Sequence, residues 1–97
     1  MMTPDPNQLW RIPLEADLRH REWEGEHVFF HGGAGDTHRF SEAAALVLLH
    51  LMTTPTSEAE LATLLSEAAE VDLAEAEAAL NNVLAELDRI EYAEPVQ

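Results

Sequence analysis

Apolar and polar residues follow two different patterns along this chain. Between Leu18 and Phe40, short runs of β-branched and aromatic residues alternate with glycine-containing segments, which is typical of strands and tight turns. From Ser41 onward, apolar residues return every three or four positions, the spacing of amphipathic helices. The order predicts one α+β domain, a small antiparallel three-stranded β-meander followed by three helices, which is a winged-helix-like arrangement.

The strands of the predicted meander cover residues 18–23, 27–31 and 37–40. Glu24-Gly25 supplies a tight turn, and residues 32–36 supply a flexible glycine-rich turn. Alternation predicts that Val28 and Phe30 face the core. The residues then directed away from the core are His27, Phe29 and His31.

Shorter features flank the meander. Trp10-Arg11-Ile12 predicts a short edge strand, or an arm whose tryptophan docks onto the core, and Pro13 ends it. Pro95 is expected to end the ordered chain. We therefore expect a flexible tail over residues 1–9, a single domain over 10–94 and a second tail over 95–97.

Each of the three predicted helices begins at a residue that caps helices well, namely Ser41, Ser57 and Asp72. The core sides of the first two helices are expected to carry Ala44, Val47, Leu48 and Leu51, then Leu61, Leu64 and Leu65. In the third helix the period of 3.6 passes through Ala76, Leu80, Val83, Leu84 and Leu87. Of these, Leu84 and Leu87 are expected in the core.

The net charge of the chain limits the kinds of molecule that it can bind. Nineteen acidic residues stand against five basic ones, giving a formal charge of −14. Such a domain repels phosphate backbones and anionic membrane surfaces, so we expect no nucleic acid and no membrane as a partner. A cationic partner would be attracted, although solubility alone explains the charge equally well.

The chain lacks the residues that several kinds of site and segment require. The chain has no cysteine, which excludes disulfides, thiol catalysis and cysteine-ligated zinc. No apolar run is long enough to span a bilayer, and the first residues do not form a secretory signal, so we expect a cytoplasmic protein.

The segment from Trp23 to Ala45 carries a family resemblance. This segment resembles small PqqD-like proteins in three places. They are the Trp-x-Gly-Glu-His-Val-Phe-Phe-His pattern, the Gly35-Asp36-Thr37-His38 segment and the Ser-x-x-Ala start of the helix. The resemblance is to the group described as the PqqD family peptide chaperone of the HPr-rel-A system. It extends through the capped second helix to the Leu87-Asp-Arg-Ile-Glu pattern and covers about residues 10–94.

This resemblance implies a recognition element for ribosomally made and modified peptides, a non-catalytic chaperone that binds a precursor or leader peptide and presents it to modifying enzymes. In the family, the leader adds as a strand beside the third strand and rests against the third helix. The peptide-binding residues expected here are Thr37, His38, Arg39 and Phe40 in the strand, and Ala76, Leu80 and Val83 in the helix. The HPr-rel-A grouping would add a kinase-like protein and a nucleotidyltransferase-like protein as partners.

The strand pattern supports the same mode physically. An unpaired strand edge is a template for one more strand, with backbone hydrogen bonds supplying affinity and side-chain pockets supplying selection. Glu75, Glu77 and Glu86 would meet basic side chains of the peptide. The same edge also permits a homodimer, in which two copies of the chain pair with each other.

Some residues of the chain are also compatible with functions other than peptide binding. His20, His27, His31 and His38 suggest a metal site, but their spacing is loose, and surface histidines are favoured, so no metal or cofactor is expected. The glycine-rich turn lacks the following helix and the lysine of a phosphate loop. Asp36 and Glu42 are interpreted as turn and cap residues, not as an acid–base pair, so we expect no enzyme. A winged-helix regulatory module remains an alternative.

Overall fold

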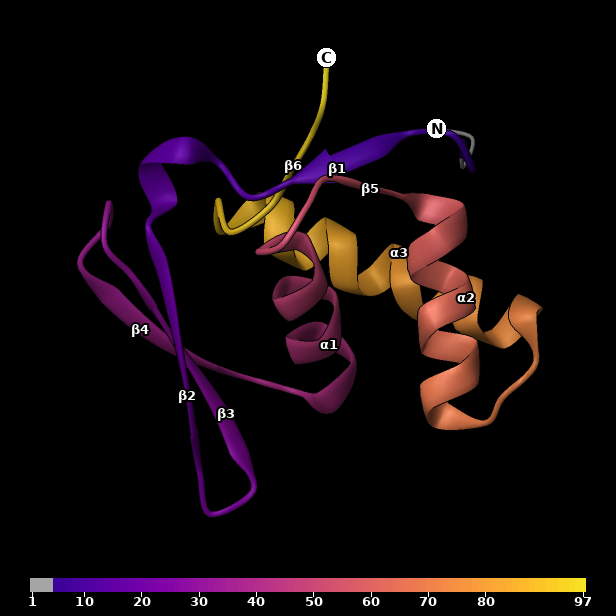
Figure 1. The fold of residues 1–97 in the computed structure, drawn as a ribbon, viewed down its shortest axis with the longest axis horizontal. Coiled ribbons are helices and arrows are strands. Elements are labelled where there is room, and N and C mark those ends of the chain that lie inside the picture. The colour runs from indigo at the N-terminus through magenta and orange to yellow at the C-terminus, as the bar shows by residue number, and fades with distance from the viewer. Residues whose placement is uncertain (1–4) are drawn as a thin grey trace.

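The computed structural model describes residues 5–97 and consists of two small antiparallel sheets and three α-helices (Figure 1). The part of the expected N-terminal tail over residues 1–4 lies outside the described residues. The elements in chain order are β1 (Leu9–Arg11), the 3-10 helix η1 (Leu14–Ala16), β2 (Leu18–Trp23), β3 (Glu26–His31), β4 (Asp36–Phe40), α1 (Glu42–Leu51), β5 (Thr56–Ser57), α2 (Glu58–Ala69), α3 (Leu73–Arg89) and β6 (Glu94–Pro95). The expected meander and three helices are confirmed.

The meander is the sheet β2-β3-β4, whose strands pair in that order. Glu24 and Gly25 both adopt left-handed backbone angles, with φ values of 51° and 80°, as a two-residue hairpin turn requires. This turn sets Trp23 opposite Glu26, and the register then runs back to Leu18 opposite His31. In Figure 1 the β2–β3 hairpin extends away from the helices as a long arm.

The prediction of which β3 residues face the core is wrong. Phe29 is fully buried and His31 is 5% exposed, whereas Phe30 is 40% exposed and Val28 is half-buried. The physical reason is the hairpin register, because buried Leu18 lies opposite His31 and a strand alternates its faces. His31 and Phe29 therefore point inward.

A second sheet was not expected. Its order is β5-β1-β6, so β1 is a central strand and not an edge strand. Trp10 is buried there, and its indole N–H donates to Glu58 Oε2 at 2.9 Å. The sheet joins the two ends of the described chain, since Trp10 lies opposite Pro95 and the Val96 N–H donates to the Leu9 carbonyl. Strand β1 thus begins one residue before the expected domain start, and β6 includes the proline expected to end the order.

The helix starts follow from local sequence. Side-chain oxygens of Ser41, Ser57 and Asp72 accept hydrogen bonds from backbone N–H groups three residues later, at 3.2, 3.2 and 2.8 Å. These bonds satisfy donors that a helix leaves free at its first turn. Helix α1 then lies between the meander and α3, with Val47 and Leu48 fully buried (Figure 1).

The glycine-rich turn between β3 and β4 packs closely against η1. Gly32 N–H donates to the Asp17 carbonyl and Gly33 N–H to the Ala16 carbonyl. A Cβ atom on Gly33 would lie 2.2 Å from the Glu15 carbonyl oxygen, so only glycine fits there. The turn expected to be flexible is therefore held to the segment that links the two sheets.

Among residues 5–97, no helix combines the length and the hydropathy that crossing a bilayer requires.

Candidate functional site

A groove of about 350 Å³ lies between β4 and α3. Its walls are residues 38–41 on one side and residues of the second half of α3 on the other, with Ala44 of α1 between them. The lining residues are His38, Arg39, Phe40, Ser41, Ala44, Asn82, Val83, Glu86 and Leu87.

The β4 wall of this groove is a sheet edge. Within the part of the chain that the structure describes, β4 pairs with β3 alone. A strand with one neighbour leaves a row of backbone N–H and C=O groups without a ladder partner. The site therefore offers main-chain hydrogen bonds on one side and a helix surface on the other.

Aromatic packing holds β4 in place. The rings of His38 and Phe40 stack with centroids 5.9 Å apart, and both meet the ring of Tyr92 edge-on at 5.3 and 5.2 Å. Phe40 also packs edge-on against buried Phe29 at 5.7 Å. Edge-to-face contacts of this kind add to the stability gained by burial. The strand edge is thus fixed from its inner face.

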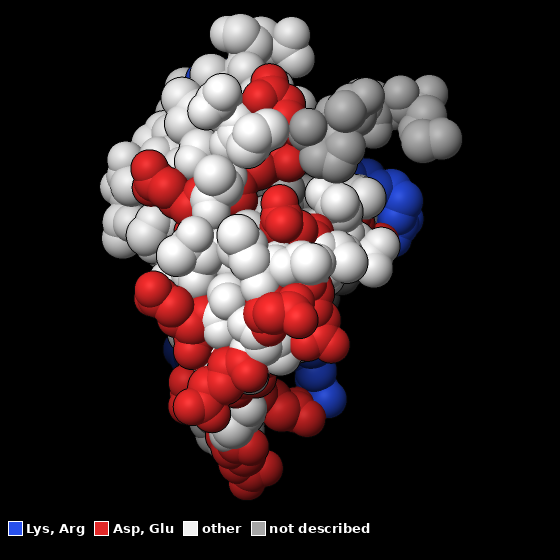
Figure 2. Space-filling view, turned by 90° about the vertical axis from the view of Figure 1, so that its right-hand side faces the viewer, with Lys and Arg blue, Asp and Glu red and all other residues white. Residues whose placement is uncertain are grey.

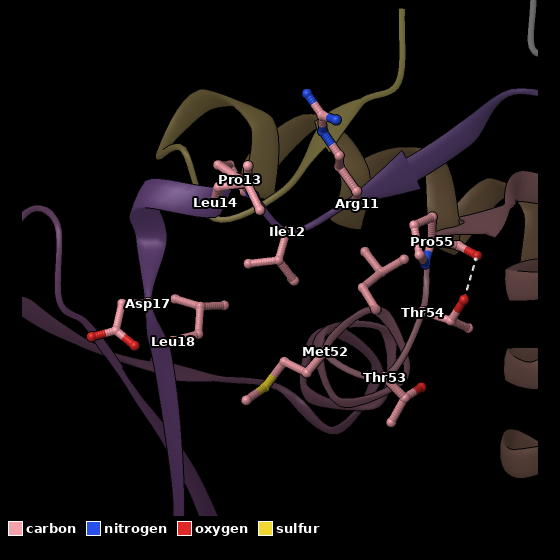
Figure 3. A pocket seen from close by; sticks show the side chains of 11 residues that line it. Arg11, Ile12, Pro13, Leu14, Asp17, Leu18, Met52, Thr53, Thr54 and Pro55 are labelled. Atoms are coloured by element: carbon pink, nitrogen blue, oxygen red, sulfur yellow. Dashed lines mark hydrogen bonds between the residues drawn. The ribbon is translucent and has the colours of Figure 1, made fainter.

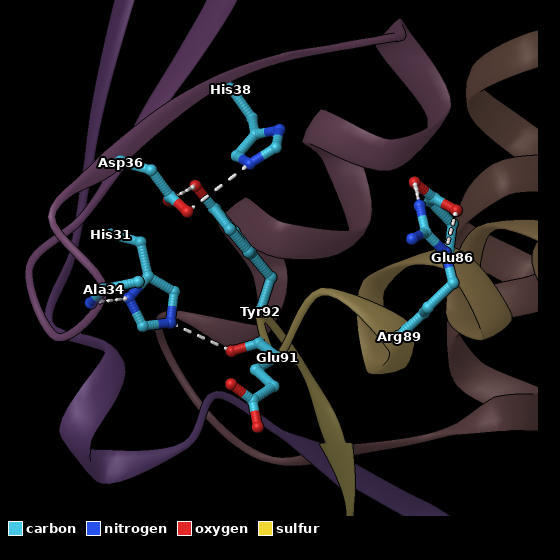
Figure 4. A network of polar contacts seen from close by, with 8 residues as sticks. All are labelled: His31, Ala34, Asp36, His38, Glu86, Arg89, Glu91 and Tyr92. Atoms are coloured by element: carbon cyan, nitrogen blue, oxygen red, sulfur yellow. Dashed lines mark hydrogen bonds and ion pairs between the residues drawn. The ribbon is translucent and has the colours of Figure 1, made fainter.

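A polar network supports the same strand (Figure 4). The Tyr92 hydroxyl donates to Asp36 Oδ1 at 3.2 Å, and His38 Nε2 lies 3.7 Å from Asp36 Oδ2. Burial, and then the charge and hydrogen bond of Asp36, raise the pKa of Tyr92 well above its ordinary value of 10.0. Tyr92 therefore remains a neutral hydrogen-bond donor.

His31 ties the β3–β4 turn to the segment that follows α3. The Ala34 N–H donates to its Nδ1 at 2.9 Å, so Nε2 carries the proton and donates to the Glu91 carbonyl at 3.0 Å. Glu91 itself has a left-handed φ of 64°. The buried imidazole thus has a structural role in positioning the turn.

The α3 wall carries a compensated charge. Arg89 Nε and Nη2 donate to the two carboxylate oxygens of Glu86 at 3.1 and 2.6 Å (Figure 4). The hydrogen bond from Arg89 lowers the pKa of Glu86. Desolvation opposes this shift, and the positive charge of Arg89 adds to it. The rim of the groove therefore carries less net negative charge than the sequence alone implies.

The structure brings together only some of the expected peptide-binding residues. His38, Arg39, Phe40 and Val83 line the groove, while Thr37 lies in β4 outside the lining. Ala76 and Leu80 are 1% and 2% exposed and lie in the core, and neither of them lines the groove. On α3, the side chains of these two residues face the other helices. Leu84 is a core residue as expected, and buried Leu87 also reaches the groove.

Sequence reasoning missed Asn82, Ser41 and Ala44 as lining residues. Asn82 and Glu86 are four residues apart and share one side of α3, next to Val83. Once Val83 is assigned to the groove, this spacing identifies Asn82 and Glu86 as its neighbours there. Ser41 follows from its position directly after β4.

The alternative sites gain no support from the geometry. His20 Nε2 and His27 Nδ1 lie 3.0 Å apart, but within residues 5–97 no three His, Asp or Glu side chains gather as metal ligands do. Asp36 interacts with Tyr92, and Glu42 lies 3.5 Å from His27 Nε2. Figure 2 shows acidic side chains spread over the face that carries α2 and α3.

A second hollow of about 460 Å³ lies between the β1–η1–β2 segment and the end of α1 (Figure 3). Apolar side chains, including exposed Met52 and Leu14, form much of its lip. It carries only Arg11 and Asp17 as charged groups, and it is lined by residues other than those of the β4–α3 groove.

An open sheet edge that faces a helix across a groove is a geometry that can accept an extended chain segment as a further strand. Residues 26–91 match the family model described as coenzyme PQQ synthesis protein D (PqqD), and this chain belongs to that family. No curated protein matches the chain in sequence.

Solved structures share the fold. A structure described as lasso peptide synthetase B1 complexed with the leader peptide is 23% identical, with a TM-score of 0.68 over 89% of this chain and 98% of that one. TbiB1 in complex with the TbiA(beta) leader peptide is 17% identical, with a TM-score of 0.72 over 90% and 98%. The PqqD truncation of Methylobacterium extorquens PqqCD, described as a stand-alone recognition element, is 22% identical, with a TM-score of 0.71 over 95% of each chain.

Proposed function

We propose that this protein is a non-catalytic recognition element that binds the leader segment of a ribosomally made precursor peptide and presents it to modifying enzymes. The observation that carries the proposal is the groove between the open edge of β4 and α3. Membership of the PqqD family supports it, as do the two similar structures described as holding leader peptides.

The peptide would add as a fourth strand beside β4. Its backbone would pair with the free edge, and every second side chain would enter the groove toward Val83 and Leu87. The polar rim formed by Asn82 and Glu86 would select among the side chains that enter.

The narrower assignments belong to the same proposal. An HPr-rel-A system, with kinase-like and nucleotidyltransferase-like partners, follows from the sequence resemblance. A cytoplasmic location is a separate proposal that does not rest on this resemblance. A homodimer through β4 would occupy the same edge as the peptide, so the two interactions would compete.

A pair of neighbouring asparagines allows a matched test. Asn82 lines the β4–α3 groove, whereas Asn81 faces a separate hollow beside α2, and both are exposed. Asn82→Trp would fill the groove without touching the core, and Asn81→Trp makes the same change outside it. The ligand is the fluorescently labelled precursor peptide encoded beside this chain, titrated by anisotropy.

We expect Asn82→Trp to weaken binding by about tenfold or more, which corresponds to about 1.4 kcal/mol, and Asn81→Trp to leave binding unchanged. Equal affinities of both variants and the unmodified protein would place the peptide elsewhere. Failure of the unmodified protein to bind the precursor would overturn the function itself.

A further inference from the structure

One face of the meander has no helix packed on it. Helix α1 covers the inner face through Phe29 and Phe40, while the opposite side of the sheet is free in the described structure (Figure 1). We call this free side the outer sheet face. It is formed by Arg19, Arg21, Val28, Phe30, Thr37 and Arg39, with Trp23 and Glu26 at the hairpin end.

The strand register gathers these side chains. Arg19 lies opposite Phe30, and Val28 lies between Arg21 and Arg39 on the two neighbouring strands. Residues directly opposite each other in a sheet point to the same side. Phe30 is 40% exposed and Trp23 is 62% exposed, so the face has an apolar row that is in contact with solvent.

The outer sheet face also concentrates the positive charge of the protein. Three of the five basic residues of the chain lie on it, although the formal net charge is −14. Arg19 is 3.8 Å from Asp17 and Arg39 is 3.3 Å from Glu26, and both arginines are about three-quarters exposed, at 75% and 77%. Within residues 5–97, Arg21 forms no ion pair.

This combination is unlike a solvated sheet surface. Exposed aromatic residues flanked by arginine are the composition enriched at protein interfaces. The weak exposed ion pairs of Arg19 and Arg39 leave their guanidinium groups available for an incoming carboxylate. An acidic partner is repelled by the α2–α3 face seen in Figure 2, which orients it toward the sheet.

We propose that the outer sheet face docks an acidic, apolar-centred surface of a partner protein, and that this partner is the modifying enzyme. The identity of the partner rests on the proposed function. A peptide strand added at β4 would extend this sheet, and its alternate side chains would lie on the same outer face. An enzyme seated there would contact the recognition element and its bound peptide together.

A defined probe locates the surface without knowledge of the enzyme. The full isotope-labelled chain is titrated, by nuclear magnetic resonance, with acetyl-Glu-Glu-Phe-Glu-Glu-amide and with acetyl-Lys-Lys-Phe-Lys-Lys-amide. We expect the acidic peptide to shift the amides of Arg21, Val28 and Phe30 and the indole signal of Trp23. The basic peptide should leave these signals in place.

Charge reversal supplies the matched variants. Arg21→Glu lies on the outer sheet face, and Arg11→Glu makes the same change in the other sheet, where Arg11 pairs with Glu94 at the surface. Arg21→Glu should abolish the shifts, and Arg11→Glu should retain them. With the co-encoded enzyme in place of the probe, Arg21→Glu should weaken binding by about tenfold while the precursor peptide still binds.

The opposite results would overturn the proposal. These are acidic-peptide shifts confined to the β4–α3 groove, no shift on the outer sheet face, or the same shifts from a single-stranded DNA oligonucleotide and not from the acidic peptide. Because precursor binding is measured separately, loss of that binding would count against the proposed function and not against this surface.

Discussion

Tyr92, which is fully buried after α3, donates a hydrogen bond to Asp36, the first residue of β4, across 56 residues of sequence. The bond joins the segment that follows the groove helix to the strand that forms the other groove wall. Together with the ring contacts to His38 and Phe40, it sets the distance between the two walls. Tyr92 is therefore a positioning residue for the groove.

Tyr92→Phe tests the contribution of the hydroxyl. The ring contacts remain, while Asp36 loses its buried donor, so we expect the free energy of unfolding to fall by about 1 kcal/mol. Urea denaturation followed by circular dichroism measures it. An unchanged free energy of unfolding would show that the bond adds nothing to stability.

The raised pKa of Tyr92 predicts loss of stability at alkaline pH. An unfolded chain loses the phenolic proton near pH 10.0, while the folded chain retains it to higher pH. Stability from this group is therefore complete below about pH 10 and falls as the pH rises toward the folded pKa. Tyr92→Phe should remove this part of the pH dependence.

Absorbance provides a direct reading of that titration, because the chain contains one tyrosine. We expect the phenolate signal of the native protein to appear only at a pH above 10, together with unfolding, and at the ordinary pH in urea. A native titration near pH 10.0 without unfolding would contradict the burial and the bond.

His31→Leu removes two hydrogen bonds from a buried position. The Ala34 N–H and the Glu91 carbonyl would lose their partner, so we expect destabilisation of about 1–3 kcal/mol. His50→Leu is a suitable control, since His50 is only half-buried and its ring forms no hydrogen bond within residues 5–97. Similar urea midpoints for the two variants would contradict the structural role of His31.

Gly33→Ala tests the docking of the β3–β4 turn on η1. The new Cβ would collide with backbone of Glu15, and relief of the clash requires the turn to move, at a cost of about 1–3 kcal/mol. Gly25→Ala meets no atom and suffers only from its positive φ, so it should cost about 1 kcal/mol. A larger effect at Gly25 than at Gly33 would argue against a fixed turn.

Local signals were sufficient for much of the fold. The caps at Ser41, Ser57 and Asp72 and the Glu24-Gly25 turn act over a few residues, and each is present where it was expected. Such features depend on neighbouring backbone alone, so the sequence can be interpreted without knowledge of the tertiary structure.

The orientation of β3 depended on longer-range information. Val28, Phe29 and Phe30 are all apolar, so alternation does not identify the buried face. The turn at Glu24-Gly25 fixes the register, and the buried position of Leu18 then assigns His31 to the core. Treating histidines as surface residues concealed this relation.

The second sheet and the groove lining could not be predicted from the sequence, because both depend on tertiary packing. Strands β5 and β6 are two residues each and exist only because β1 lies between them. On α3, the periodic residues Ala76, Leu80 and Val83 look equivalent in sequence. Helix packing buries the first two and leaves Val83 at the groove.

Amide hydrogen exchange of the intact protein, with and without the precursor peptide encoded beside it, tests the central claim most directly. The account predicts that the peptide slows exchange of β4 amides and of groove residues on α3, while the β2 edge, an internal control, remains unchanged. Protection along β2, or peptide binding without any change in β4, would contradict it.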